Sequence, residues 1–398
     1  MPVGDLGKPA FHADNGTAEC AAAGRYSSSI SIIKAVESKY PSKPRWQSVT
    51  PHNLGSFSAV CWYTGKALSD RFGGRVPVGL MLAAVGGSPI EYWLPPSSKP
   101  NINKCEVDRP QCDRMYNDSW FYTDIVSQYA PFTIGALVWD QAERDVKCPV
   151  SVAAYACMER ELVSSWRDAF RTPHAPFVAV QLPGYTGALN NGTGSYSGYI
   201  SAEMVHAMRL EQDVGTASLT NATAVPTYDK SCPHSPYGSV HNTEKGPIGE
   251  RVAAQLYQML RPNQPTIETP LRAVRATAKV ASNGGYSVTV SFRGGSSPFV
   301  LGGTKNCTTC CDGSAPAGSA ADGHTLDFDA SATGGDGPWV NSTGAVVDRG
   351  TGSVTFKVTL SSRPALVRYT AASIFPQCAL FNAERLPAMP FTIAVSEA

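Results

Sequence analysis

The sequence predicts an α/β protein with a mostly parallel sheet, followed by a C-terminal all-β domain of sandwich type. Up to residue 262, apolar runs that suit buried strands alternate with segments of helical periodicity, which is typical of βαβ units. After a proline-rich segment at 261–270, short alternating strands follow one another, separated by Gly, Ser and Asp. We therefore expect one domain over residues 1–262 and a second over residues 263–398.

Strands and helices of the first domain follow from its apolar pattern. Three runs have the composition of strands that are buried on both faces: 76–85, 132–139 and 177–182. Helices are expected between and after them, because apolar residues recur there every three or four positions: 57–72, 155–170, 202–212 and 248–260.

Two long loops interrupt this alternation, at 95–113 and 183–198. Loops of this length in a compact domain often form the walls of a binding site. In the second domain, alternating apolar residues predict four strands in particular: 273–280, 286–292, 353–360 and 365–369.

Composition excludes several classes of protein. The 398 residues include 33 Lys and Arg against 32 Asp and Glu, and this neutral balance argues against a nucleic-acid-binding protein. No apolar run reaches the ~18 residues of a membrane span. Disorder is excluded because 42% of the residues are hydrophobic, enough to fill a core.

The eleven cysteines favour disulfides over a metal site. Three of them stand close together at Cys307, Cys310 and Cys311, but a zinc site would need a second pair or a His at regular spacing. Only His324 and Cys378 follow, at irregular spacing. We therefore expect disulfide bonds and an oxidising compartment.

Six Asn-x-Ser/Thr sequons point to the same compartment: Asn15, Asn117, Asn191, Asn221, Asn306 and Asn341. Together with the cysteines they predict a secreted, lysosomal or cell-surface glycoprotein. The first residues, however, lack the apolar centre of a signal peptide. Either the protein is cytosolic or the chain starts too late, and the odd number of cysteines favours the second alternative.

Three segments contain residues suited to ester chemistry. Gly86 and Gly87 end a predicted strand, where backbone N–H groups can approach a ligand closely. Gln141 ends the next strand, and an amide there can donate to a developing oxyanion. His241 lies in a loop before a helix, where an imidazole can act as a general base. Taken singly, each of these residues also fits an ordinary turn or surface loop.

No nucleophile accompanies these residues. The strand-to-helix elbow Gly-x-Ser-x-Gly is absent, and the nearest match, at 194–198, has Tyr196 at its centre. Cys61 lies on the apolar face of a predicted helix, which indicates a structural thiol. From its residues alone, the sequence predicts an oxyanion-binding scaffold with a candidate base.

Taken together and in this order, these segments resemble the sialate O-acetylesterase family of SGNH/GDSL-like esterases. The resemblance covers almost the whole chain and rests on these stretches: Phe57-Ser-Ala-Val-Cys-Trp62, Pro77-Val-Gly-Leu80, Gly86-Gly-Ser-Pro-Ile-Glu91, 134–143, Ser235-Pro-Tyr-Gly-Ser-Val-His241 and Leu386-Pro-Ala-Met-Pro-Phe-Thr392. It implies a three-layer SGNH-hydrolase-like fold. It also implies hydrolysis of O-acetyl esters of sialic acid or other sugars by a serine and a histidine, with no metal or other cofactor.

The resemblance implies a role for each candidate residue by position: His241 as base, Gly86 or Gly87 with Gln141 as the oxyanion hole, Glu143 as support of the turn, and Arg209 with Gln212 as a matching helical pair. Two positions depart from the family, since Asp140 and Ala142 stand where it often has Tyr and Gly. Many SGNH enzymes have an Asp three residues before the His, where this chain has Gly238. The nearest upstream candidate for the acid is Asp229, and otherwise a backbone carbonyl would orient the histidine.

The family places its serine in a Gly-Gln-Ser-Asn-Met block after the first strand, and this sequence has no such block. Because the residues after Met1 resemble the continuation of that block, we expect an N-terminal truncation. The signal peptide, an N-terminal β domain, the first strand and the serine would lie outside the chain, which would then be inactive. The alternative is a secreted, non-catalytic glycoprotein that binds carbohydrate through its C-terminal β domain.

Overall fold

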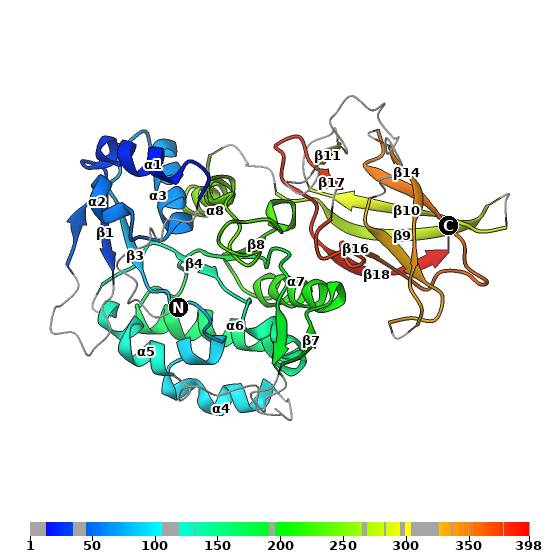
Figure 1. Ribbon diagram of the computed structural model, residues 1–398, viewed down its shortest axis with the longest axis horizontal. Coiled ribbons are helices and arrows are strands. Elements are labelled where there is room, and N and C mark those ends of the chain that lie inside the picture. Colours follow the sequence, from blue (N-terminus) through cyan, green and yellow to red (C-terminus); the bar gives the residue numbers. More distant parts are fainter. Residues whose placement is uncertain are drawn as a thin grey trace.

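The protein has two parts, an α/β part that precedes a mostly β domain (Figure 1). This computed structural model describes residues 13–34, 45–105, 119–130, 132–190, 196–264, 269–281, 284–294, 299–303, 326–335, 337–348, 350–376 and 378–397. The exact boundary at residue 262 stays a prediction.

The α/β part contains two small sheets built on parallel strands. The first has the order β2-β1-β3, in which β1 (Ile30–Lys34) and β3 (Val78–Leu82) run parallel and β2 (Gln47–Ser48) is antiparallel. The second has the order β4-β5-β8, all parallel: β4 (Leu137–Asp140), β5 (Phe177–Val180) and β8 (Ala222–Val225). The strands predicted at 76–85 and 177–182 are thus confirmed as β3 and β5, whereas β4 overlaps only the end of the strand predicted at 132–139.

The expectation of one continuous sheet is not met in the described residues. No ladder joins β3 to β4 there. At the carboxyl end of β3, the carbonyl of Leu82 instead accepts the hydroxyl of Tyr129 at 2.7 Å. A side chain therefore satisfies a backbone group that a neighbouring strand would otherwise pair with.

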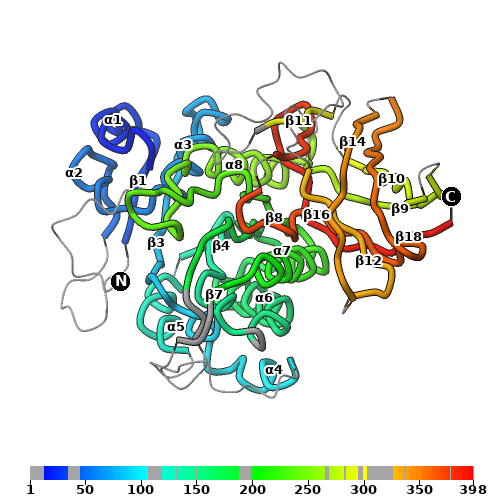
Figure 2. Tube along the Cα trace, turned by 45° about the vertical axis from the view of Figure 1, so that its right-hand side comes forward, coloured from blue at the N-terminus to red at the C-terminus, as the bar shows by residue number. Residues whose placement is uncertain are grey.

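The second sheet lies between two layers of helices (Figures 1 and 2). Successive residues of a strand face opposite sides, so Phe177 and Ala179 of β5 pack against α6 (Pro149–Ala169) and α7 (Ala202–Ala217). Val178 and Val180 pack against α3 (Ala59–Arg71) and α8 (Lys245–Leu260). This alternation explains why the strand is apolar throughout, and all four predicted helices are confirmed.

The remaining elements of this part are short. They are α1 (Gly16–Ala22), α2 (Pro51–Leu54), α4 (Lys99–Ile102), α5 (Trp120–Asp124), the hairpin of β6 (Ala188–Asn190) and β7 (Tyr196–Tyr199), and single 3-10 turns that include η4 (Asn103–Cys105), η5 (Val126–Tyr129) and η7 (Tyr228–Lys230). Helix α1 is fastened to α3 by Glu19, whose carboxylate accepts the Trp62 indole N–H at 2.9 Å and the Lys66 ammonium at 2.7 Å.

The C-terminal domain is built on a sheet of order β13-β12-β16-β18-β9-β10-β15-β14 in the described residues. Its strands are β9 (Arg272–Val280), β10 (Tyr286–Arg293), β12 (Phe328–Ser331), β13 (Val340–Asn341), β14 (Thr343–Asp348), β15 (Ser353–Val358), β16 (Leu366–Tyr369) and β18 (Phe391–Glu397). A separate pair joins β11 (Val300–Gly303) to β17 (Cys378–Phe381). The four predicted strands are confirmed, as β9, β10, β15 and β16.

The sandwich expectation is corrected, because the main sheet is one sheet that curls around its own core. In the strand order β12 and β15 are far apart, yet the rings of Phe328 on β12 and Phe356 on β15 stack with their centroids 4.7 Å apart. Tyr369 and Phe391 pack against the same Phe328 ring. The curled sheet encloses most of its inner face, and the separate β11–β17 pair packs against the same core. A strand with one buried face alternates in either architecture, so the sequence pattern is the same.

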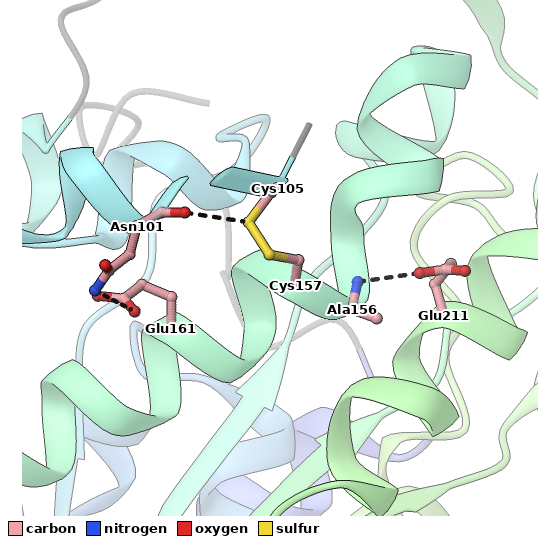
Figure 3. Close-up of a disulfide and its surroundings, with 6 residues drawn as sticks. All are labelled: Asn101, Cys105, Ala156, Cys157, Glu161 and Glu211. Atoms are coloured by element: carbon pink, nitrogen blue, oxygen red, sulfur yellow. Dashed lines mark hydrogen bonds between the residues drawn. A yellow bond between two sulfur atoms is a disulfide. The ribbon is translucent and has the colours of Figure 1, made fainter. Parts of the chain in front are cut away.

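Disulfides are present, as the cysteine content predicted. Cys105, at the end of η4, is bonded to Cys157 in the middle of α6 (Figure 3). Cys148 and Cys378 are also disulfide-bonded. Free thiols in the described ranges are Cys20, Cys61 and Cys232. The cluster at Cys307, Cys310 and Cys311 lies outside the described residues.

Within the part of the chain that the structure describes, no helix has the length and apolar character needed to cross a bilayer. The same residues contain no group of three or more His, Cys, Asp or Glu side chains arranged to hold a metal ion.

Candidate active site

The Gly86-Gly87 pair forms a turn beyond the carboxyl end of β3 and is exposed. Gly87 has a φ of 74°, in the left-handed region that favours glycine. The following Ser88 is buried, and its hydroxyl donates to the Val85 carbonyl at 2.7 Å and accepts the Trp93 indole N–H at 2.9 Å. Ser88 therefore braces the turn, and the oxyanion role of the glycines stays a prediction.

Gln141 directly follows β4, and its side chain is buried in a polar network. Its Nε2 donates to the Ser88 carbonyl at 2.9 Å and to the Asp145 carboxyl at 2.6 Å. Its Oε1 accepts the Tyr155 hydroxyl at 2.8 Å. Both amide hydrogens thus serve contacts within the protein, which gives Gln141 a structural task. Its predicted oxyanion role requires one of these bonds to open.

Asp145 accepts hydrogen bonds from two segments of this network. Its Oδ2 also accepts the backbone N–H of Ile90 at 3.1 Å, which ties the segment after β3 to the segment after β4. Burial raises the pKa of Asp145 well above its usual range, and the nearby carboxyl of Glu91 raises it further. The hydrogen bonds from Gln141 and Ile90 and the charge of Arg144 act in the opposite direction and lower the pKa of the same carboxyl.

Ala142 adopts an unusual backbone conformation next to Gln141. Its φ is 131°, and its side chain is completely buried. Positive φ of this size is essentially restricted to glycine, so an alanine there stores strain on the order of 1–3 kcal/mol. The sequence difference noted at this position therefore falls on a residue whose backbone favours Gly.

Glu143 contributes to the turn through its backbone, because its carbonyl accepts the hydroxyl of Tyr185 from the loop after β5. Burial raises the pKa of the Glu143 carboxyl to about 7, and the nearby Asp140 carboxyl adds to the rise. The charge of Lys245, at the start of α8, lowers the pKa of both carboxyls. A group that titrates near neutral pH therefore lies beside the candidate site.

His241 is half-buried in the loop between η7 and α8. Its backbone N–H donates to the Gly238 carbonyl at 2.9 Å, and its own carbonyl accepts the Ser235 hydroxyl at 2.5 Å. The next residue, Asn242, is buried, and its amide donates to the Lys230 carbonyl at 3.2 Å. These bonds fix the backbone at the candidate base.

The loop after β5 joins the Gln141 segment to the His241 loop. Tyr185 contacts Glu143, as described above, and the next residue, Thr186, contacts Ser239. The Ser239 hydroxyl accepts the Thr186 backbone N–H at 3.1 Å and lies 3.0 Å from its hydroxyl. With the bond from Gln141 to the Ser88 carbonyl, a continuous series of hydrogen bonds connects all three predicted segments.

Asp229, the candidate acid, is 1% exposed and forms a bidentate ion pair with Arg251 of α8. Both distances are 2.7 Å, and the Lys230 ammonium lies 3.6 Å from the same carboxylate. A carboxylate held this way serves the packing of α8 against η7. Its role as catalytic acid stays a prediction.

Arg209 and Gln212 fasten α7 to the carboxyl ends of β4 and β5. The Gln212 amide accepts the Leu182 N–H at 2.8 Å and donates to the Gln141 carbonyl at 3.2 Å. Arg209 donates through Nε to the Leu182 carbonyl at 2.8 Å. Burial lowers the pKa of Arg209 to about 10. Arg209 and Gln212 thus hold the segments after β4 and β5 against α7.

The sequence did not identify four residues of this site: Asp145, Tyr155, Tyr185 and Arg251. The aromatic pair fell on stretches that read as core helix or loop, although both hydroxyls are used. The position of Asp145, four residues after Gln141 in a turn, was the available signal for it.

Three predicted glycosylation sites have exposed asparagines: Asn15, Asn221 and Asn341. The Asn221 amide donates to the His174 carbonyl at 3.2 Å. Asn117, Asn191 and Asn306 lie outside the described residues.

Comparison with known proteins points to one family. The family model described as carbohydrate esterase, sialic acid-specific acetylesterase, matches residues 39–258. A sialate O-acetylesterase from Rattus norvegicus is 27% identical over 254 residues, covering 52% of this chain and 44% of that protein. The Homo sapiens protein of the same name is 25% identical over 232 residues, covering 52% and 41%. The chain thus spans less than half the length of these curated relatives.

A solved structure has a similar fold. The crystal structure of a carbohydrate acetylesterase from Xanthomonas citri superposes with a TM-score of 0.70 at 21% identity, covering 97% of this chain and 77% of that one. The similarity therefore includes both the α/β part and the C-terminal β domain.

Proposed function

The chain belongs to the sialic acid-specific acetylesterase family of carbohydrate esterases, and from this we propose that its site hydrolyses O-acetyl esters of sugars. The observation that carries the proposal is the hydrogen-bonded connection between the turn after β3, Gln141 and the His241 loop. Ligand sites of parallel α/β folds form at the carboxyl ends of the strands. The candidate residues follow β3, β4 and β8 at those ends.

The proposed reaction is acyl transfer in two steps. His241 removes the proton from a serine hydroxyl, whose oxygen attacks the acetyl carbonyl and forms a tetrahedral oxyanion. As that intermediate collapses, the sugar oxygen leaves with the proton from His241. Water, deprotonated by His241, then cleaves the acetyl-enzyme and releases acetate and the free serine.

The oxyanion would be stabilised by the backbone N–H of Gly86 or Gly87 and by Gln141. Since the Gln141 amide already donates to Ser88 and Asp145, binding of the oxyanion must replace one of these bonds. The bond to Asp145 is the stronger candidate to persist, because at 2.6 Å it is the shorter of the two.

The imidazole of His241 must be oriented for proton transfer. Asp229 is the proposed acid by position, although Arg251 engages both of its oxygens. Each carboxylate oxygen has a second lone pair, so pairing with Arg251 does not exclude a further bond to an imidazole. Asp229→Asn would disturb both the ion pair with Arg251 and the proposed bond to His241, whereas a substitution of Arg251 changes the ion pair and leaves the Asp229 carboxylate in place.

The serine of this mechanism has no counterpart in the 398 residues, which lack a Gly-Gln-Ser block. We therefore propose that these residues alone do not hydrolyse acetyl esters, because loss of a nucleophile removes most catalysis in enzymes of this type. The exposed sequons at Asn15, Asn221 and Asn341 and the disulfides support a secreted or lysosomal location.

Acetate release from p-nitrophenyl acetate and from O-acetylated sialic acid tests this proposal. We expect no release above background from the 398-residue chain. If the coding sequence upstream of Met1 supplies an in-frame Gly-Gln-Ser-Asn block, the extended protein should be active and should lose activity on His241→Ala.

Two results would contradict parts of the proposal. Activity of the 398-residue chain that His241→Ala abolishes would place the nucleophile within these residues. Unchanged activity of an extended His241→Ala protein would refute the assignment of the base. Absence of the block upstream, with binding of sugars by the chain, would favour a non-catalytic carbohydrate-binding protein.

A further inference from the structure

The loop that contains His241 is fastened to the segment 227–231, which follows β8. Asn242 donates to the Lys230 carbonyl at 3.2 Å, and the Lys230 ammonium pairs with Glu244 at 2.9 Å. Asn242 and Glu244 both lie between His241 and the first residue of α8. The position of His241 therefore depends on the position of segment 227–231.

That segment is among the most buried parts of the molecule. Thr227, Tyr228, Asp229 and Ser231 are all 1% exposed or less. The Thr227 hydroxyl donates to the carbonyl of Gln181 at 2.6 Å, and the Ser231 hydroxyl donates to Tyr228 at 2.7 Å. A short segment with no regular strand or long helix is thus held by its own side chains.

The C-terminal β domain also contacts this segment. The Tyr228 hydroxyl donates to the Ala388 carbonyl at 2.9 Å. The rings of Tyr228 and Tyr369 pack edge-to-face with their centroids 6.1 Å apart. Tyr228 belongs to the hydrophobic core of the β domain, although it lies in the α/β part of the sequence. The β domain therefore anchors the support of the His241 loop.

Arg251 completes this support and is 7% exposed. Its guanidinium binds Asp229 through two hydrogen bonds of 2.7 Å, donates to the Pro226 carbonyl at 2.9 Å, and reaches the Arg385 carbonyl of the β domain at 3.4 Å. One planar side chain thus joins α8, the segment after β8 and the C-terminal domain. Lysine has neither the fork nor the number of donors to make these bonds together.

We propose that Arg251 and Tyr228 are positioning residues for the candidate base, through which the C-terminal β domain holds the His241 loop in place. The inference rests on the proposed function for the role of His241, and it assigns the β domain a part in the site. The competing explanation is that these contacts only stabilise the fold.

A matched pair of variants separates the two explanations. Arg251→Lys removes the bidentate bond to Asp229 and keeps the charge. Arg272→Lys makes the same change in another bidentate pair, with Asp213 at 2.5 and 2.7 Å, which also joins the two domains but lies on α7 and β9. A general loss of stability should appear in both variants, whereas an effect on His241 should appear in the first alone.

The readout is the NMR titration of the histidine side chains in the full chain, with the His241 resonance identified by its absence from a His241→Gln variant. We expect Arg251→Lys to move the titration midpoint of His241 by about 0.5 pH unit or more, since shifts of about one unit are the usual spread for histidines in folded proteins. Arg272→Lys should leave that midpoint unchanged, even if both variants lower Tm.

An unchanged His241 midpoint in a folded Arg251→Lys protein would overturn the proposal, whatever the change in Tm. If Arg251→Lys does not fold, Tyr228→Phe decides, because it keeps the ring and removes only the hydroxyl, which contacts the Ala388 carbonyl and the Tyr369 hydroxyl of the β domain. In that variant too, an unmoved His241 resonance refutes the inference. Acetate release enters none of these measurements, so failure of the proposed function would be seen separately.

Discussion

Glu159 in the middle of α6 should make the protein less stable as the pH rises. Its side chain is 0% exposed, and neither carboxyl oxygen has a hydrogen-bond partner among the described residues. It faces Gly215 of α7, where any larger residue would overlap its Oε2. Burial raises the pKa of Glu159 well above its usual range, and the carboxyls of Asp213 and Glu211 add to this.

The direction and size of the effect follow from proton linkage. In the unfolded chain the carboxyl titrates near its reference pKa of 4.5, whereas in the folded protein it keeps its proton to a higher pH. The stability that this group contributes is therefore fully present below pH 4.5 and is lost as the pH rises towards the folded pKa. One retained proton corresponds to about 1.4 kcal/mol per pH unit, or about 2.7 kcal/mol between pH 5 and pH 7 while the folded carboxyl remains neutral.

Replacement by Gln preserves the shape and removes the proton. We expect Glu159→Gln to be more stable than the unchanged protein at pH 7, with the difference in free energy of unfolding shrinking by up to about 2.7 kcal/mol at pH 5. Urea denaturation at the two pH values measures it. Glu161→Gln on the same helix is the control, because Glu161 accepts a hydrogen bond from Asn101 at the surface. Parallel pH dependences for the Glu159→Gln and unchanged proteins would refute the reasoning.

Three further substitutions test the backbone and the cross-link by their free energies of unfolding. Ala142→Gly should stabilise by about 1 kcal/mol, because relief of strain at φ 131° exceeds the entropy cost of glycine; lower stability would contradict this. Joint replacement of Cys105 and Cys157 by Ser should cost about 4 kcal/mol, the loop-entropy value for a separation of 52 residues, and an unchanged urea midpoint would count against it. Gly184→Ala should cost about 1–3 kcal/mol, since its Cβ would overlap the Ile374 carbonyl oxygen, whereas Gly135→Ala meets open space and should be neutral.

Local patterns predicted the elements of the fold well. The apolar run at 177–182 became β5, because a strand covered by helices on both faces has no polar side to display. The periodic segment at 155–170 became most of α6 and its C-cap, and the apolar stripe of this helix faces the sheet. These features depend on residues close in sequence, so the sequence contains them directly.

Local patterns could not predict which distant segments pair with one another. Alternating strands are the same in a sandwich and in a curled sheet, and the pairing of β18 with both β16 and β9 is what makes this sheet continuous. The parallel contact of β18 with β9 joins residues about 120 positions apart. In the site, the engagement of both Gln141 hydrogens and the pairing of Asp229 with Arg251 depend on partners that periodicity does not identify.

A loop residue such as His241 can be identified as a candidate from the sequence, but its position in the site cannot be predicted from it. His241 is a candidate because it lies in a loop just before a helix, within a stretch that resembles the family, although a loop histidine taken alone fits an ordinary surface position. Its position, however, is set by contacts of segment 227–231 with the β domain, more than 130 residues further along the chain. The contacts that stabilise the domain interface are therefore the same contacts that fix the candidate base. A substitution there changes stability and site geometry together, and only a control such as Arg272→Lys, at the same interface but away from the loop, can distinguish a positioning effect from a loss of folding.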